Sequence, residues 1–342
     1  MQIRPQQFTA LAAATAISVV VAAATYGYFN RWSAGRVEGV TALPALTRQA
    51  TSVAAIEIAQ GDRKLTLQRV GDQWRIKERD GYPAQGERVR ALLVTLQDAE
   101  LIEQKTSIKD KLKLLELEDP TAKDAKSRLI RVLDGKGGVI GEVVIGKSRD
   151  NVFGASKGGT YVRRPAETQA WLARGEPKAP LEVRDWVQSS IFDLDQAKMQ
   201  KITLEHAGEE PLVIEKAEGK DQKFKLAAMP EDKKLKQGVT IDQIAQGFSS
   251  MSLDDVRKLP APPAGDGVSV LKLEAEGGLA VTFRLRREAD QSWVSLSATG
   301  AEGDAKKKAD EINAQANGWE FKIPQWKADQ IGKRRADIFE TS

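Results

Sequence analysis

The sequence predicts an α+β protein in which an N-terminal transmembrane helix precedes a duplicated unit of antiparallel strands and amphipathic helices. Three observations lead to this class. The 342-residue chain carries an uncharged apolar run near its start. After this run, apolar and polar residues alternate between glycine-containing bends, which is typical of short antiparallel strands. The same succession of patterns returns near residue 200, which indicates an internal repeat.

The apolar run covers residues 8–29 and reads FTALAAATAISVVVAAATYGYF. About 20 apolar residues suffice to cross the hydrocarbon core of a bilayer. Arg4 precedes the run, and Arg31 and Arg36 follow it. We therefore expect residues 1–35 to form a membrane anchor with its flank. A cleaved signal peptide is the alternative, because Ala22-Ala23-Ala24 offers a small-residue cleavage site, but signal cores typically have only about 7 to 15 apolar residues.

The first half of the body is expected over residues 50–196. Gly61-Asp62 and Gly71-Asp72 separate short stretches in which apolar residues alternate, and this predicts hairpins. An amphipathic helix is expected to follow, because apolar residues recur there at helical spacing. The alternating positions are Ile56, Ile58, Leu65, Leu67, Trp74 and Ile76, and the helical stripe is Val89, Leu92, Leu93 and Leu96.

The second half is expected over residues 197–342 and repeats this order. Apolar and polar residues alternate first. After Thr240, a candidate N-cap, apolar residues recur at helical spacing. The alternating residues are Ile202, Leu204, Leu212, Ile214, Phe224 and Leu226, and the stripe is Ile241, Ile244, Phe248 and Met251.

Later segments of the two halves can also be paired. Residues 129–148 align with residues 268–287 on the double-glycine turns Gly137-Gly138 and Gly277-Gly278, and GTYVRR (159–164) aligns with QSWVSL. The closing segments PAETQAWLA (165–173) and PQWKADQIG (324–332) are expected to be equivalent as well. Ile191-Phe192 then corresponds to Ile338-Phe339.

Residues 141–148, GEVVIGKS, fit the phosphate-binding pattern G-x-x-x-x-G-K-[ST]. A working phosphate loop is a glycine-rich turn between a strand and a helix. Here the β-branched residues Val143, Val144 and Ile145 favour an extended strand, and the following RDNVFGASKGG shows no helical stripe. We therefore interpret Gly141, Gly146, Lys147 and Ser148 as a chance match at a strand end. No cofactor and no catalytic residue is predicted.

The remaining composition favours no other chemistry. The chain contains no cysteine and a single histidine, His206, which is expected to be a surface residue in a turn. No metal site is predicted, since the acidic clusters lack the spacing of a calcium loop. The formal net charge of +4 is interspersed along the chain, which argues against nucleic-acid binding. Trp171, Trp186 and Trp326 could stack on carbohydrate, although burial is the favoured interpretation.

Several short motifs together resemble a known bacterial family. They are VGDQW, LELEDP, VVIGKS, GTYVRR, LEVRDW and FKIPQW. The chain is similar along nearly its whole body to the family catalogued as domain of unknown function 4340. In that family a Gly-Lys pair typically closes a strand shortly before the tyrosine strand, which agrees with the interpretation of Gly146-Lys147. The charged stretch at residues 300–318 departs from the family pattern.

The resemblance implies a non-catalytic extracytoplasmic domain that docks onto membrane partners such as subunits of ABC-type export systems like those of gliding motility. We expect a single-pass protein of the bacterial inner membrane, anchored through residues 8–29, with its body in the periplasm and acting as a binding or scaffold subunit. The alternative is a protein that binds cell-envelope polysaccharide or peptidoglycan. A nucleotide-dependent enzyme is the third and weakest hypothesis.

Overall fold

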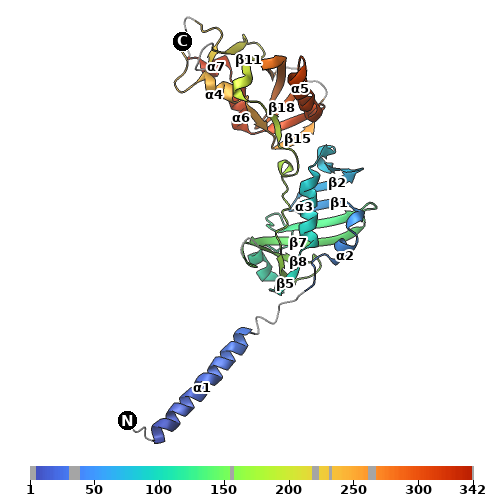
Figure 1. Cartoon of the computed structure of the whole chain (residues 1–342), viewed down its shortest axis with the longest axis vertical. Coiled ribbons are helices and arrows are strands. Elements are labelled where there is room, and N and C mark those ends of the chain that lie inside the picture. Colours follow the sequence, from blue (N-terminus) through green and yellow to red (C-terminus); the bar gives the residue numbers. More distant parts are fainter. Residues whose placement is uncertain are drawn as a thin grey trace. The chain divides into compact units, whose positions relative to one another are not determined.

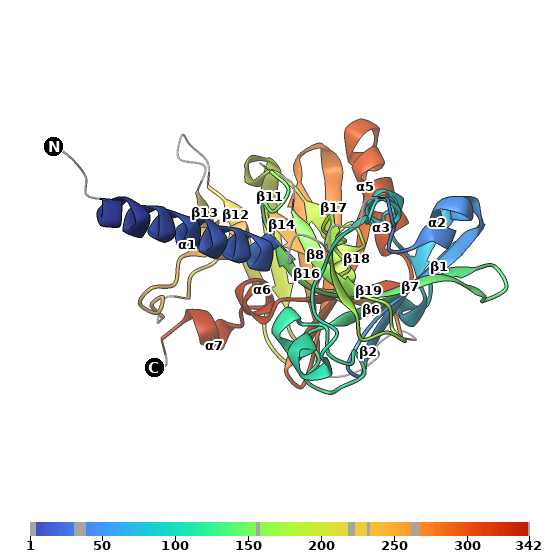
Figure 2. The same cartoon turned by 90° about the horizontal axis from the view of Figure 1, so that it is seen from below.

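A computed structural model gives the fold, and it describes residues 5–30, 39–154, 158–217, 223–230, 233–260 and 267–340. The chain divides into two compact units. Unit 1 comprises Met1–Thr66 and Arg90–Ala179, and unit 2 comprises Leu67–Val89 and Pro180–Ser342. Figures 1 and 2 show the elements in two views at right angles.

Helix α1, Pro5–Asn30, contains the expected membrane segment. Residues 8–13 and 27–29 of that segment lie outside the side chains that the structure describes. Among the residues that the structure describes, no helix combines the length and the apolar character needed to cross a membrane.

The first sheet has nine strands in the order β4-β3-β2-β1-β6-β7-β8-β9-β5. Its pairs, such as β1–β6, β6–β7 and β7–β8, are antiparallel. The α-helices of this half of the chain are α2 (Pro44–Arg48) and α3 (Gly86–Gln97). The strands are β1 (Val53–Gln60), β2 (Arg63–Val70), β3 (Gln73–Ile76), β4 (Tyr82–Pro83), β5 (Leu101–Gln104), β6 (Arg128–Asp134), β7 (Val139–Arg149), β8 (Gly159–Arg163) and β9 (Ala170–Arg174).

The second sheet has eight strands in the order β13-β12-β11-β16-β17-β18-β19-β15. Its strands are β11 (Met199–Glu205), β12 (Leu212–Lys216), β13 (Phe224–Leu226), β15 (Asp255–Lys258), β16 (Val268–Ala275), β17 (Leu279–Glu288), β18 (Gln291–Thr299) and β19 (Trp319–Ile323). A separate pair joins β10 (Ser190–Asp193) to β14 (Ser250–Ser252). The helices of this half are α4 (Ile241–Gln246), α5 (Gly303–Ala316), α6 (Gln325–Ile331) and α7 (Arg335–Ile338).

The two sheets follow one strand order. When the edge strand β4 is set aside, β3-β2-β1-β6-β7-β8-β9-β5 corresponds position by position to β13-β12-β11-β16-β17-β18-β19-β15. The double-glycine turns join β6 to β7 and β16 to β17, and each contributes a left-handed residue, Gly137 at φ 82° and Gly277 at φ 72°. The aligned segments 129–148 and 268–287 therefore form equivalent hairpins.

The alignment of the two closing segments is wrong. Residues 165–173 lead into strand β9, whereas residues 324–332 contain helix α6. The strand in the β9 position of the second sheet is β19, and the charged stretch before it forms α5. This stretch is helical because Ala305, Ala309, Ile312 and Ala316 place small and apolar side chains on one buried face. Ile191-Phe192 lies in β10, but Ile338 ends α7, so that pairing is wrong too.

The helical stripes were predicted with unequal success. In α3, the side chains of Val89, Leu92 and Leu96 are buried as expected. Helix α4 is shorter than its stripe, because it ends at Gln246 before Gly247, while Phe248 packs edge-on against Phe283 with ring centroids 5.7 Å apart. Thr240 precedes α4, but its side chain makes no capping hydrogen bond.

Candidate functional site

The residues of the phosphate-binding match lie in the long strand β7. Ser148 pairs with Thr160 of β8 in the sheet register, and the side chain of Lys147 is exposed. The strand ends at Arg149 and is followed by a turn. Because the backbone here is an extended ladder strand, its N–H groups do not converge on a phosphate as they do in a glycine-rich loop before a helix. Gly146, Lys147 and Ser148 thus lie in a strand and not in a turn that leads into a helix.

Gly146 has a packing reason to be glycine. A Cβ atom at this position would lie 2.3 Å from the carbonyl oxygen of Leu115 and 2.6 Å from that of Glu116. Both atoms belong to backbone, so the neighbouring segment cannot rotate away as a side chain would. The contact at Gly141 is milder, because the nearest atom is the Leu43 Cδ2, 3.1 Å away, at the end of a flexible side chain. The glycine of the motif therefore allows two backbone segments to approach closely.

Arg163 of β8 binds the residues that directly follow Leu115 and Glu116. Its Nε donates to the carbonyl oxygen of Leu117 at 2.7 Å, and its Nη2 donates to that of Glu118 at 3.1 Å. Burial lowers the pKa of the Arg163 guanidinium from its usual value, and nearby Asp119 opposes this shift. The Glu118 carbonyl also accepts from the Ser127 hydroxyl at 2.9 Å, so Arg163 joins a hydrogen-bond network that holds this segment and has a structural role.

His206 is buried, and the expectation of a surface position is wrong. Only 7% of the residue is exposed. Its Nε2 donates to the carbonyl oxygen of Lys333 at 2.9 Å, and this leaves Nδ1 to accept from the Ser269 hydroxyl at 2.8 Å. The imidazole joins the end of β11 to β16 and to the C-terminal segment. No pattern in the sequence near His206 points to these partners, because they are far away along the chain.

Metal-binding side chains do not gather within the described ranges. No group of three or more histidine, cysteine, aspartate or glutamate side chains is placed there to hold a metal ion.

The three candidate tryptophans differ in exposure. Trp186 is 2% exposed, and its Nε1 donates to the carbonyl oxygen of Pro180 at 2.9 Å. Trp171 is half-buried in β9. Trp326 is 64% exposed, contrary to the interpretation favoured from the sequence. Trp326 alone of these three therefore offers an open indole face to a ligand.

Trp326 stands at a groove between α4 and α6. The groove has a volume of about 610 Å³, and its lining combines the indole with amide, hydroxyl and charged side chains. The lining side chains include those of Thr240, Gln243, Gln246, Trp326, Asp329 and Lys333. The neighbouring Lys327 is buried, its Nζ donates to the carbonyl oxygen of Gly247 at 3.1 Å, and burial lowers its pKa. This lysine ties α6 to the end of α4 and so fixes the groove walls.

Comparison with known proteins identifies the family. A family model described as "Domain of unknown function (DUF4340)" matches residues 74–268, which is more than half of the 342-residue chain. The chain belongs to this DUF4340 family. No curated protein matches it. The DUF4340 match begins in β3 and ends at the first residue of β16. It therefore includes Gly146-Lys147-Ser148 and α4, but not Trp326.

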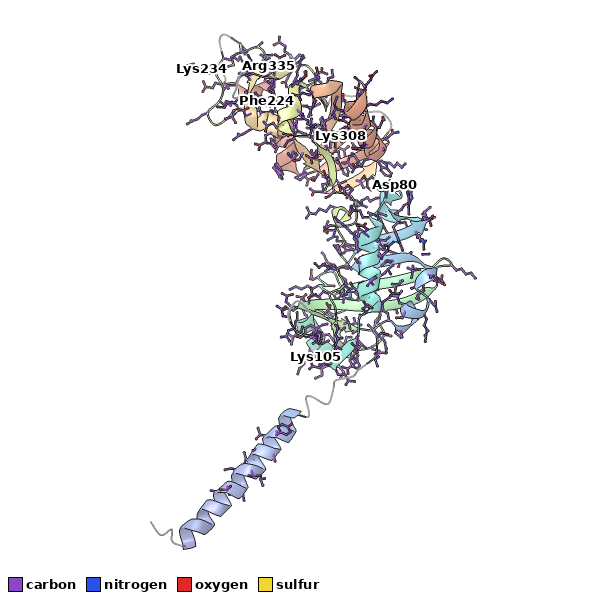
Figure 3. The ribbon with its side chains drawn as sticks, viewed as in Figure 1. Asp80, Lys105, Phe224, Lys234, Lys308 and Arg335 are labelled. Atoms are coloured by element: carbon purple, nitrogen blue, oxygen red, sulfur yellow. The ribbon has the colours of Figure 1, made fainter. Side chains whose placement is uncertain are left out.

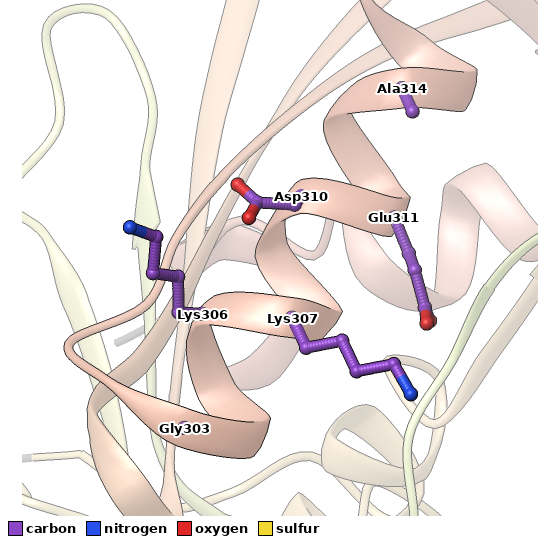
Figure 4. A pocket seen from close by; sticks show the side chains of 6 residues that line it. All are labelled: Gly303, Lys306, Lys307, Asp310, Glu311 and Ala314. Atoms are coloured by element: carbon purple, nitrogen blue, oxygen red, sulfur yellow. The ribbon is translucent and has the colours of Figure 1, made fainter.

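Helix α5, outside the DUF4340 match, borders a shallow surface pocket of about 540 Å³. Figure 4 shows Lys306 and Asp310 on one side of the helix, and Lys307 and Glu311 on the other. The four side chains extend away from the helix without converging on one point. Alternating charges at a spacing of four residues are typical of a solvated helix face, and we assign no chemistry to this pocket.

A charge cluster built around one buried carboxylate, the Glu320 cluster, lies on the second sheet. It consists of Arg257, Arg286, Glu288, Trp293 and Glu320. Glu320 is 1% exposed, accepts hydrogen bonds from Arg257 Nε and Nη2 at 3.0 and 2.8 Å, and lies 3.4 Å from Arg286 Nε. The guanidinium of Arg257 also stacks 3.9 Å from the centroid of a Trp293 ring. Only Arg257 of this cluster falls within the DUF4340 match.

The Glu320 cluster joins three strands electrostatically. Arg257 donates to both carboxylate oxygens of Glu288, and these bonds are the main reason why the pKa of Arg257 is raised and that of Glu288 is lowered. Because every charge in the cluster faces an opposite charge, the arrangement is that of a structural network linking β15, β17 and β19.

Proposed function

We propose that this chain is a non-catalytic, membrane-anchored binding or scaffold protein with an extracytoplasmic body, and that it acts as an accessory component of an ABC-type transport system in the bacterial inner membrane. One observation carries the proposal: Gly146 and His206, the residues that most suggested chemistry, are engaged in packing and hydrogen bonding. The link to transport is supported by the family resemblance.

Two further observations support this organisation. Helix α1 has 26 residues and no charged side chain between Pro5 and Asn30, which suits a single anchoring span. The shared strand order of the two sheets supports an internal duplication, with residues 50–196 and 197–342 as its halves. A duplicated body is suited to contact one partner through two related surfaces.

Charge placed in the middle of α1 tests the anchor. The full chain with a C-terminal tag is expected in the carbonate-resistant membrane fraction, with the tag digested by protease added on the periplasmic side. Val19→Arg combined with Val20→Arg should shift the chain largely to the soluble fraction, because each arginine at a bilayer centre costs about 2.5–3.5 kcal/mol on insertion scales. Val139→Arg, an exposed position in β7, is the matched control and should stay in the membrane. A soluble wild-type chain would exclude the anchored arrangement.

The transporter role needs a separate test. Cross-linking in intact cells, followed by detergent extraction, capture through the tag and mass spectrometry, should recover membrane subunits of an ABC-type system. Capture of glycan fragments without a transporter subunit would contradict this role.

The exposed Trp326 favours glycan binding as a second candidate function. An indole beside amide and hydroxyl groups can stack on a sugar ring while the polar groups bind its hydroxyls. Trp326→Ala should weaken retention on isolated peptidoglycan about tenfold, since a stacking contact contributes up to about 1.5 kcal/mol. The melting temperature should not change, because the side chain is 64% exposed. Equal retention of Trp326→Ala, and of a further variant Trp171→Ala, would remove this candidate.

A further inference from the structure

Residues 105–115 of unit 1 expose apolar and basic side chains together. Helix η4, Lys109–Leu115, forms most of this segment. Leu114 is 75% exposed, the largest exposed fraction among the large apolar side chains that the structure describes, and Ile108 is 53% exposed. Two open aliphatic side chains this close together are not explained by packing within the unit.

Lysines surround these two side chains. The segment contains Lys105, Lys109, Lys111 and Lys113 against the single carboxylate of Asp110. Lys105 pairs with Glu103 at 2.6 Å, and Lys109 lies close enough to Asp119 to help lower the pKa of that carboxyl, which is set mainly by its bonds to Thr121. Within the described residues, Lys111 and Lys113 form no ion pair, and both are exposed. The surface therefore carries unneutralised positive charge beside apolar groups.

The fold holds this segment in place from behind. Leu112, between the exposed positions, is 5% exposed and packs into a cluster with Leu117, Val144 and Tyr161. The N–H of Leu117 donates to the Leu112 carbonyl at 2.9 Å, and the helix ends at Glu116 in a left-handed conformation. The close approach at Gly146 fixes the same turn. The exposed Leu114 therefore lies in a turn that packing and hydrogen bonds hold in one conformation.

The segment also lies near the point where the chain arrives from α1. Beside the start of β5, the N–H of Gly39 donates to the Glu100 carboxylate at 3.0 Å, and the N–H of Leu101 donates to the Val40 carbonyl at 2.7 Å. Strand β5 forms one edge of the first sheet and continues directly into the segment. Figure 3 places Lys105 at this end of unit 1. The eight residues between Asn30 and Gly39 can span at most about 30 Å.

We propose that the surface formed by Ile108, Lys111, Lys113 and Leu114 rests on the anionic lipid surface of the membrane that holds α1. This inference depends on the proposed anchoring. Apolar side chains flanked by lysines enter the boundary between headgroups and acyl chains while their ammonium groups contact lipid phosphates. The short connection to α1 keeps this surface within reach of the bilayer. Helix α1 inside the bilayer and this surface on the lipid headgroups are then two linked contacts, which together orient unit 1.

A single fluorescent label tests this contact in the full chain. Because the protein has no cysteine, Leu114→Cys creates one labelling site for an environment-sensitive nitrobenzoxadiazole dye. The chain is reconstituted into vesicles of phosphatidylcholine alone or with phosphatidylglycerol. We expect a blue-shifted, several-fold brighter emission in the anionic vesicles, quenched by a nitroxide on the lipid chains. Adding Lys111→Gln and Lys113→Gln should abolish most of the gain.

Val139→Cys is the matched control, because Val139 is an exposed apolar residue at the far end of β7, about 23 Å along the strand from Gly146. Its emission should be the same in both vesicles. Flotation with the vesicles separates the two possible failures. If the chain floats but the dye at position 114 remains in water, the lipid contact is disproved and the anchor stands. If the chain does not float, the proposed anchoring itself is wrong.

Discussion

Glu320→Gln is expected to lower the free energy of unfolding by about 3 kcal/mol. Removing one partner of a buried ion pair typically costs about 3–5 kcal/mol, because the remaining charge is left without compensation. The lower end applies here, since both arginines retain Glu288. Arg257, whose side chain is 32% exposed, lies 2.8 Å from that carboxylate, and Arg286, whose side chain is 19% exposed, lies 3.5 Å from it. Chemical denaturation of the detergent-solubilised full chain measures the change.

Two companion variants show whether burial explains the effect. Glu288→Gln should change stability by less than about 1 kcal/mol, because that carboxylate is exposed and exposed ion pairs contribute little. Combining Glu320→Leu with Arg286→Met should recover most of the loss, since an apolar pair can replace buried charges of similar volume. If the double variant is as unstable as Glu320→Gln, the Glu320 cluster does not hold the strands together through its charges.

Gly146→Ala should destabilise the protein by about 2–3 kcal/mol. Extra atoms in a packed region typically cost about 1–3 kcal/mol, and the upper end applies because the Cβ would meet two backbone carbonyls. The smaller backbone entropy of alanine in the unfolded chain offsets only about 0.4–1 kcal/mol of this cost. Thermal unfolding followed by circular dichroism should show a clearly lowered melting temperature.

Lys147→Ala provides the matched control for Gly146→Ala. This lysine is exposed, so its replacement should change stability by less than about 0.5 kcal/mol. A true phosphate-binding loop would show a different pattern, in which ATP raises the melting temperature of the wild-type protein and Lys147→Ala abolishes that increase. Observing that increase would overturn the interpretation of residues 141–148 as a strand.

The regular parts of the fold were predictable from the sequence because they depend on local patterns. Alternation identified the strands around Ile56 and Ile202, the β-branched run at Val143 identified β7, and the helical stripe at Val89 identified α3. The mixed α and β class with mostly antiparallel strands followed from these patterns and is confirmed. The match of the closing segments failed because shared proline, tryptophan and alanine residues do not distinguish strand β9 from helix α6.

The candidate sites were less predictable, because they depend on contacts between distant residues. The burial of His206 arises from Ser269 and Lys333, which are 63 and 127 positions away. The reason for glycine at position 146 lies in the carbonyls of Leu115 and Glu116. The lysines of residues 105–115 are visible in the sequence, but only the structure distinguishes the buried Leu112 from the exposed Leu114.

The strand order has a consequence for the limits of the family match. In the first sheet, a fragment restricted to residues 74–268 would keep β6 but lose β1, the strand that pairs with it. In the second sheet, the fragment would keep β11 but lose nearly all of β16, which pairs with β11, and all of β17, which pairs with β16. Central strands would then become open edges, which readily pair with other chains. The matched region thus cuts through both sheets, and its boundaries are not those of an independently folding domain.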